Sequence, residues 1–266
     1  MSRLTPKAPD DAPSGASTMP TPDPSLPAAL ARELDALAAR LQRTIPDARL
    51  TLQPLPGCPN LRLALINADY PTGPLPEAVM RAVIAAPAYW AFCWGSGLAL
   101  ARWLLAHPDQ VRGRRVVDLG PGSGVVAIAA ALAGADAVIA CDNDADALAA
   151  TAFNARLNGV KIDLAPRLEA VPAGQDLLLM ADVLYDRSNL PLLREAAALA
   201  NTALVADSRI QSLPDPAYRL IGTDDALTLP NLGEFDEFRT VRFFLSERTS
   251  GRTSGRTFGR TSGRTS

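Results

Sequence analysis

A glycine-rich segment in the middle of the chain has the residue types and spacing of a ligand-binding loop. Residues 118–124 are Asp-Leu-Gly-Pro-Gly-Ser-Gly, and they overlap a short apolar run, 116–119. Gly120, Gly122 and Gly124 carry no side chain, so the backbone can approach a ligand closely. A helix that begins after this loop points its N-terminal amides at the ligand. The segment therefore predicts a cofactor-binding loop at the end of a strand.

Two features of this loop favour S-adenosylmethionine over a dinucleotide. The dinucleotide pattern has a glycine at its sixth position, where this chain has Val125. Asp118 would repel a pyrophosphate, whereas it would attract the ammonium and sulfonium groups of S-adenosylmethionine. Asp142 follows the next apolar run, where an acid accepts hydrogen bonds from both ribose hydroxyls, and Asn143 would flank the adenine. A glycine-rich turn without a ligand is the alternative interpretation.

A second candidate site lies further along the chain, in residues 181–186, Ala-Asp-Val-Leu-Tyr-Asp. These residues end another apolar run, so Asp182 and Tyr185 should lie at the same sheet edge as the glycine loop and face the transferable methyl group. Methyltransferases that act on amide nitrogens or adenine often carry Asn-Pro-Pro-Tyr here, and this chain does not. The alternative is that Asp182 only caps a turn.

Alternating strands and helices are expected to position these residues. Apolar runs predict strands at 116–119, 137–141, 161–164, 177–180 and 202–206. Helical patterns occupy 97–106, 125–133, 146–158 and 189–200, and the region up to residue 245 can supply two closing strands. This alternation predicts an α/β fold with a doubly wound, mostly parallel seven-stranded sheet.

The chain divides into four expected regions. Residues 1–25 are rich in proline and small polar residues and predict a disordered leader. Residues 26–96 should form a small accessory element, with a helix that starts near Pro27 and two strands at 48–53 and 61–65. Residues 97–246 should form the catalytic domain. Residues 247–266 repeat Arg-Thr-Ser-Gly and predict a disordered tail.

The formal net charge of −2 hides an uneven distribution of charge. Residues 247–266 hold five Arg and one acidic residue, so the rest of the chain has 21 basic and 27 acidic residues, a net charge of −6. An acidic body binds nucleic acid poorly. Cysteines at three scattered positions, 58, 93 and 141, and a single histidine predict reduced, buried thiols and no bound metal.

No apolar run reaches the ~18 residues that a membrane helix needs. The N-terminal residues also lack the apolar core of a signal peptide. We therefore expect a cytoplasmic protein with no membrane partner, and we expect it to be a monomer.

A family resemblance covers roughly residues 30–245. Residues 88–97, Ala-Tyr-Trp-Ala-Phe-Cys-Trp-Gly-Ser-Gly, precede the glycine loop, and Asp182 and Tyr185 form an Asp-Xaa-Xaa-Tyr element. Together they resemble the seven-β-strand protein lysine methyltransferases, most closely the electron-transfer flavoprotein β-subunit lysine methyltransferase group. The resemblance implies a class I S-adenosylmethionine-dependent methyltransferase fold and transfer of methyl groups to a protein lysine. The electron-transfer flavoprotein β subunit is the first candidate substrate.

The resemblance also implies roles for three side chains. Asp182 would recruit and orient the lysine amine, Tyr185 would hydrogen-bond or cap it, and Trp94 would line the channel for the lysine side chain. Trp90 is better explained as a core residue. The chain departs from the family pattern at Gly95-Ser96-Gly97, at residues 166–167 and at residues 207–209.

Two other classes of function stay open. One is methylation of another protein (such as a ribosomal protein), an RNA or a small molecule. The other is a non-enzymatic cofactor-binding scaffold that recruits partners through its Arg-rich tail. Deletion of residues 247–266 separates the scaffold from the enzyme, because only the scaffold needs them.

Overall fold

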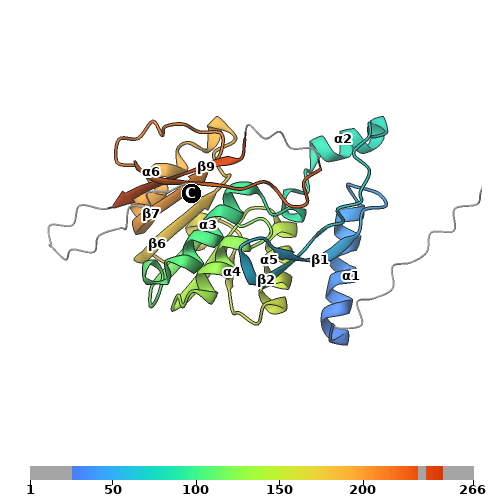
Figure 1. The fold of residues 1–266 in the computed structure, drawn as a ribbon, viewed down its shortest axis with the longest axis horizontal. Coiled ribbons are helices and arrows are strands. Elements are labelled where there is room, and N and C mark those ends of the chain that lie inside the picture. The colour runs from blue at the N-terminus through green and yellow to red at the C-terminus, as the bar shows by residue number, and fades with distance from the viewer. Residues whose placement is uncertain (1–25, 233–237, 248–266) are drawn as a thin grey trace, which may run out of the picture.

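The computed structural model describes residues 26–232 and 238–247 of the 266-residue chain. The predicted leader, 1–25, lies outside the described residues, as does all of the predicted tail except Glu247. Within the described part, a central sheet is covered by helices, and an N-terminal element stands at one side of it (Figure 1).

The central sheet has seven strands in the order β5-β4-β3-β6-β7-β9-β8. Their bounds are β3 Arg115–Leu119, β4 Ala137–Cys141, β5 Asp163–Ala165, β6 Gln175–Ala181, β7 Ala200–Asp207, β8 Arg219–Asp225 and β9 Thr240–Glu247. The first five strands of this order, β5 to β7, run parallel to one another, and β9 is antiparallel to both β7 and β8. The predicted doubly wound, mostly parallel seven-stranded sheet is confirmed.

Strand β6 shows why such short apolar runs become strands. Leu177 and Leu179 pack into the core on one face of the sheet, and Leu178 and Met180 pack into the core on the other. Successive side chains of a strand point to opposite faces, so a continuous apolar run needs cover on both sides. The helices on both faces provide that cover.

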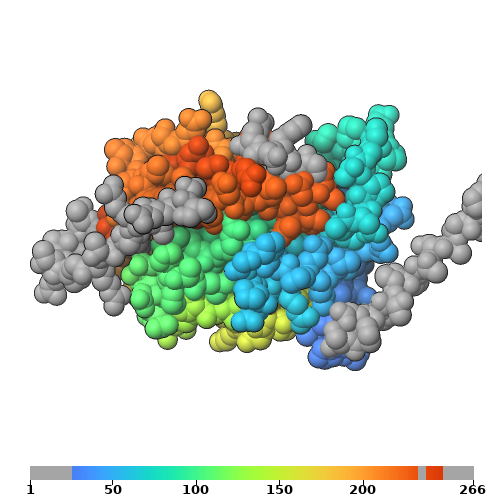
Figure 2. Space-filling model, in the orientation of Figure 1, coloured from blue at the N-terminus to red at the C-terminus, as the bar shows by residue number. Residues whose placement is uncertain are grey.

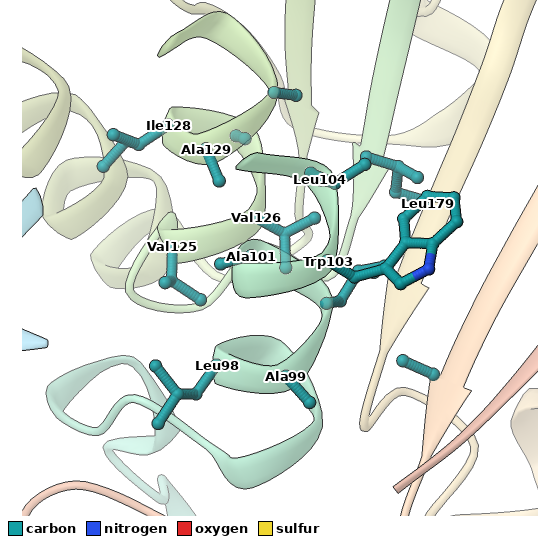
Figure 3. Close-up of a cluster of buried hydrophobic side chains, with 14 of the residues drawn as sticks. Leu98, Ala99, Ala101, Trp103, Leu104, Val125, Val126, Ile128, Ala129 and Leu179 are labelled. Atoms are coloured by element: carbon teal, nitrogen blue, oxygen red, sulfur yellow. The ribbon is translucent and has the colours of Figure 1, made fainter. Parts of the chain in front are cut away.

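Three helices cover one face, namely α3 Gly95–Ala106, α4 Val125–Leu132 and α5 Ala145–Leu157, while α6 Leu192–Leu199 packs into the core of the other. Figure 3 shows the contact between α3 and α4, where Leu98 and Ala101 face Val125 and Val126. Small residues let these two helices approach closely: a Cβ placed on Gly97 would lie 3.0 Å from Cγ1 of Val125.

The accessory element packs against α5. Helix α1 Ala28–Gln42 and the antiparallel hairpin of β1 Leu50–Leu55 and β2 Cys58–Ile66 share a core with α5, which includes Leu41, Ile66 and Phe153. In Figure 2 this blue region lies directly against the green body of the molecule. The predicted helix and hairpin are confirmed, with the hairpin turn at residues 56–57.

Some boundaries differ from the expected ones. Helix α3 begins at Gly95 rather than at residue 97, so it takes in part of the expected accessory element. Helix α6 is shorter than the predicted 189–200, because the 3-10 turn Arg187–Asn189 and Pro191 precede it. Helix α2 Glu77–Ala85 was not predicted, and none of its residues is buried. No helix in the described ranges is long and apolar enough to cross a membrane.

Candidate functional site

Carboxylates gather at the carboxyl edge of the parallel strands. Asp142 follows β4, Asp182 follows β6, and Asp207 ends β7. The glycine loop follows β3, beside β6, where the chain order of the strands switches direction. Ligands of doubly wound sheets bind at this switch point. The structure therefore brings the sequence-predicted loop and acids together at the expected edge.

The glycine loop is built around left-handed backbone. Gly120, Gly122 and Gly124 all have positive φ, between 54° and 84°. At Gly124 an added Cβ would lie 3.1 Å from the Thr151 backbone, so glycine is required there. At Gly122 the nearest atom to such a Cβ is the Cα of Trp90, at 3.9 Å, so the loop leaves open space on this side. A ligand can therefore lie against the backbone of Gly122.

Helix α5 fixes the loop from below, a contact that sequence reasoning missed. Thr151 donates its hydroxyl hydrogen bond to the Gly122 carbonyl at 3.2 Å, and the Asn154 amide donates to the Ser123 carbonyl at 2.9 Å. The Asn154 side-chain oxygen also accepts from the amide of Ala64 in β2 at 2.8 Å. Asn154 is fully buried, so it ties the accessory hairpin to the loop. A polar residue in an otherwise Ala-rich helical pattern was the available signal.

Asp118 lies under the loop rather than on its surface. It is 1% exposed, and its Oδ2 accepts a hydrogen bond from the Ala127 amide of α4 at 2.9 Å. Burial raises the pKa of Asp118 to about 7, and the Ala127 amide opposes this while Asp142 adds to it. Asp118 thus joins β3 to the first turn of α4. An attraction for the cationic part of a cofactor stays a prediction.

Asp142 is partly exposed at the end of β4. Its Oδ1 accepts from the Asp144 amide at 3.0 Å. Burial raises the pKa of Asp142, and hydrogen bonds from the Asp144 and Gly122 amides oppose that rise. The carboxylate therefore lies beside the loop, as a ribose ligand requires. Asn143 is exposed next to it, and Asp144 caps α5 by accepting from the Asp146 amide.

Asp182 has the most constrained geometry of the edge. Its φ is +54°, which is uncommon for a residue with a side chain. Ser96 donates to both carboxylate oxygens, from its amide to Oδ2 at 3.0 Å and from its hydroxyl to Oδ1 at 2.6 Å. Burial raises the pKa of Asp182 to about 6, while the Ser96 hydroxyl lowers it. Asp182 does more than cap its own turn, because it also fixes the start of α3.

Four aromatic rings from the segment before α3 and from the loop after β6 contact one another. We call Tyr89, Phe92, Trp94 and Tyr185 the aromatic cluster. The ring of Tyr89 lies 5.7 Å from Trp94 and 5.6 Å from Tyr185, in edge-to-face geometry. Tyr89 is 45% exposed and Tyr185 57% exposed. Sequence reasoning assigned no role to Tyr89, although this residue lies in the 88–97 segment.

Trp90 and Trp94 differ in burial. Trp90 is 2% exposed and belongs to the core shared by α1 and α5, which confirms it as a core residue. Trp94 is partly exposed just before α3, and its indole nitrogen donates to the Tyr89 carbonyl at 2.9 Å. Its contact with a substrate stays a prediction.

A cavity of about 310 Å³ opens beside Tyr89. Its walls are Arg40 of α1, Thr44 just after that helix, residues 86–90, and Asp144 and Asp146 at the start of α5. The accessory element therefore contributes to the surface next to the cofactor edge. Asp146 is paired with Arg40 at 2.6 Å and with Arg43 at 2.8 Å.

The chemistry of this edge fits S-adenosylmethionine. The loop offers backbone next to open space, Asp142 offers a carboxylate for ribose hydroxyls, and the surrounding acids favour a cation over a pyrophosphate. Asp207 is occupied elsewhere, since its Oδ1 accepts from the amides of Arg209 and Ile210 at 2.8 and 2.9 Å. The departure from the family pattern at residues 207–209 is therefore a self-capped turn.

Comparisons with known proteins agree with this chemistry. Residues 102–186 match the family described as ribosomal protein L11 methyltransferase (PrmA). The electron transfer flavoprotein beta subunit lysine methyltransferase of Danio rerio is 44% identical over 107 residues, which are 38% of this chain and 40% of that protein. A ribosomal protein L11 methyltransferase of Xanthomonas euvesicatoria pv. vesicatoria is 36% identical over 146 residues, 53% of this chain and 44% of that protein.

The chain spans about two fifths of the length of the curated relatives it matches. Among solved structures, magnesium protoporphyrin IX methyltransferase from Synechocystis PCC 6803 with bound S-adenosylmethionine has a TM-score of 0.46 and 17% identity, over 66% of this chain and 86% of that chain. The expected resemblance to the electron-transfer flavoprotein β-subunit lysine methyltransferases is confirmed over the matched stretch.

Proposed function

We propose that this chain, a class I S-adenosylmethionine-dependent methyltransferase related to two groups of protein methyltransferases, methylates the side-chain amine of a protein lysine. One observation carries the proposal. An acid held at the methyl-donor edge, Asp182, lies at the same edge as an exposed aromatic cluster. An acid and aromatic faces are the groups that attract an alkylammonium.

The cofactor supplies an electrophilic methyl group, and the chain has to bring a neutral amine into line with it, about 3–3.5 Å away. With an ordinary pKa near 10.4, only about one lysine in 2,500 is neutral at pH 7. Asp182 favours the charged form, so its role is to recruit and orient the ammonium rather than to lower its pKa. The proton then leaves to solvent before attack.

The protonation state of Asp182 determines the pH range in which it can recruit the lysine ammonium. Because burial raises its pKa to about 6, the carboxylate is mostly ionised at pH 7 and above. Tyr185, three residues after Asp182, is exposed, and its ring contacts that of the exposed Tyr89, which also contacts Trp94. Tyr185 would hydrogen-bond the amine, and the rings of Tyr89 and Trp94 would flank the methylene groups of the lysine.

The electron-transfer flavoprotein β subunit is the first candidate substrate. The support is the 44% identity over 107 residues to the lysine methyltransferase named for that subunit, against 36% over 146 residues to a ribosomal protein L11 methyltransferase. Ribosomal protein L11 is the second candidate, because residues 102–186 match the family named for it.

A direct test uses the purified full chain with radiolabelled S-adenosylmethionine, offered the two recombinant candidates and, separately, a lysate of the source organism. We expect label on a lysine of one protein, located by mass spectrometry, and strong loss of label with Asp182→Ala. Label confined to RNA or small molecules would reject the lysine assignment. Undiminished label with Asp182→Ala would reject the mechanism.

The scaffold alternative is tested by truncation. A chain that ends at residue 246 retains every described element except the last residue of β9. We expect this shortened chain to methylate its substrate at a nearly normal rate. Loss of function in the shortened chain, together with retained function in an Asp182→Ala full-length chain, would favour a recruiting scaffold instead.

A further inference from the structure

Ser96 makes an unusual pair of contacts for a residue in the first turn of a helix. It is fully buried, and both of its donors go to one carboxylate, that of Asp182. The hydroxyl contact, 2.6 Å from Oδ1, is short enough for a charge-assisted hydrogen bond. This serine lies in the Gly95-Ser96-Gly97 segment, where the sequence departs from the family pattern.

The carboxylate needs such support because its surroundings disfavour a fixed negative charge. Burial of the Asp182 side chain is the main cause, and Asp207 at the end of the neighbouring strand β7 adds repulsion. Arg209, which follows β7, partly offsets this repulsion. Cys93, before α3, is a buried thiol next to the carboxylate and carries no charge at neutral pH, because burial raises its pKa further.

With two donors from one residue, the plane of the carboxylate is fixed relative to α3. Trp94 of the aromatic cluster lies two residues before Ser96 and directly precedes the helix. The start of α3 therefore positions both Asp182 and Trp94 of the aromatic cluster, although Ser96 and Asp182 are 86 positions apart in the sequence.

We propose that Ser96 is the positioning residue for Asp182, whose hydroxyl holds the carboxylate ionised and turned toward the incoming lysine amine. This role rests on the proposed function, since it assigns Asp182 to the amine. Ser96 itself does not touch the substrate. Its hydroxyl acts through the orientation and ionisation of Asp182.

The test compares rates of methyl transfer between pH 5.5 and 8.5 for the wild-type full chain, Ser96→Ala and Ser96→Gly. Both variants keep the backbone amide; Ser96→Ala removes only the hydroxyl, and Ser96→Gly removes the Cβ as well. The variant-to-wild-type ratio of rates is plotted against pH, because the ratio cancels the titration of the lysine. Ser246→Ala, a buried serine in β9, is the matched control.

Loss of one hydrogen bond to an ionised acceptor should raise the pKa of Asp182 by about one unit. We expect the ratio to fall about fivefold between pH 8 and pH 6 for both variants, with an unchanged KM for S-adenosylmethionine and a flat ratio for Ser246→Ala. A ratio that is flat with pH for both Ser96 variants, whatever its level, would overturn the proposal.

A second readout separates this proposal from the proposed function. The carboxyl ¹³C signal of Asp182, assigned with Asp182→Asn, is titrated in wild type and in Ser96→Ala without any substrate. We expect the midpoint to move up by about one unit in the variant. An unchanged midpoint would overturn the role of Ser96. If wild type labels no lysine, the proposed function fails, and this titration still decides what Ser96 does to Asp182.

Discussion

Asp142 is the residue whose role in cofactor binding is most directly open to measurement. It lies at the end of β4 against the glycine loop, where its carboxylate can accept from both ribose hydroxyls. We expect Asp142→Ala to weaken S-adenosylmethionine binding about 10- to 100-fold in calorimetry, the range for hydrogen bonds to a charged group. Asp136→Ala, an exposed acid before the opposite end of the same strand, is the control and should bind normally. Equal affinities for the two variants would mean that the ribose lies elsewhere.

Tyr89 should contribute to recognition of the protein substrate. Its exposed ring contacts both Trp94 and Tyr185, so its removal opens the aromatic cluster. We expect Tyr89→Leu to raise the KM for the protein substrate about 2- to 5-fold, the size of an exposed cation–π contact, while the KM for S-adenosylmethionine stays the same. Tyr89→Phe should retain most of the affinity.

The control for this change is Tyr70→Leu, in the segment after β2. The prediction fails if Tyr89→Leu and Tyr70→Leu have the same effect, or if only the KM for the cofactor moves.

Sequence reasoning located some of these residues and missed others for one physical reason. Asp142 and Asp182 follow apolar strands, and the carboxyl ends of parallel strands meet at one edge, so local pattern is enough. Ser96 and Tyr89 act through contacts with residues 86 and 96 positions away, which no local pattern encodes. The sequence identifies Asp118 and Asp182 as acids at the sheet edge. Only the folded structure shows that they are buried and which groups they contact.

At the scale of elements, a glycine-to-alanine substitution should have a larger effect in the glycine loop than in the turn after α5. Gly124 and Gly159 both have positive φ, so alanine is strained at each by about 1 kcal/mol. At Gly159 a Cβ meets nothing within 4 Å, whereas at Gly124 it meets Thr151 of α5 at 3.0–3.1 Å. Gly124→Ala must therefore also move α4 relative to α5.

We expect denaturant unfolding to show a loss of about 1 kcal/mol for Gly159→Ala and about 2–4 kcal/mol for Gly124→Ala. Only the second change should weaken cofactor binding, because only it displaces the loop. Similar losses in the two variants, with cofactor affinity intact, would show that the loop tolerates the movement.

The elements themselves were largely predictable, with one exception. The alternation of apolar runs and helical patterns gave the order of β3 to β7, because each run needs cover on both faces. Helix α2 was not predicted, since none of its residues is buried and Met80 and Ile84 are exposed. Its inner face is only half-buried, with Val83 at the edge of the core, so the helix has a weak periodic pattern. The order of β9 before β8 in the sheet also came from the structure alone.

For the whole molecule, the acidic edge has a consequence for folding. In the absence of a cation, the chain holds Asp118 and Asp182 in surroundings that favour their neutral forms. Burial is the largest cause for both, and Asp142 and Asp207 add repulsion. When these acids are ionised and no cationic ligand is bound, the site therefore destabilises the folded chain. That instability should depend on pH.

Asp118 should make the free energy of unfolding decrease as pH rises from about 4 to about 7. Its folded pKa is about 7, above an unfolded value near 3.8, so the folded chain binds the extra proton in this range. Linkage then gives stability that is complete below pH 4 and lost through pH 7, by up to about 4 kcal/mol. In Asp118→Asn the Ala127 amide keeps an acceptor, but the titration is gone. We expect urea unfolding to show Asp118→Asn gaining stability relative to wild type by a few kcal/mol between pH 4 and pH 8, whereas Ser246→Ala, which removes no titratable group, keeps a constant difference from wild type. A constant difference for Asp118→Asn as well would mean that the buried carboxyl is not protonated in the folded chain.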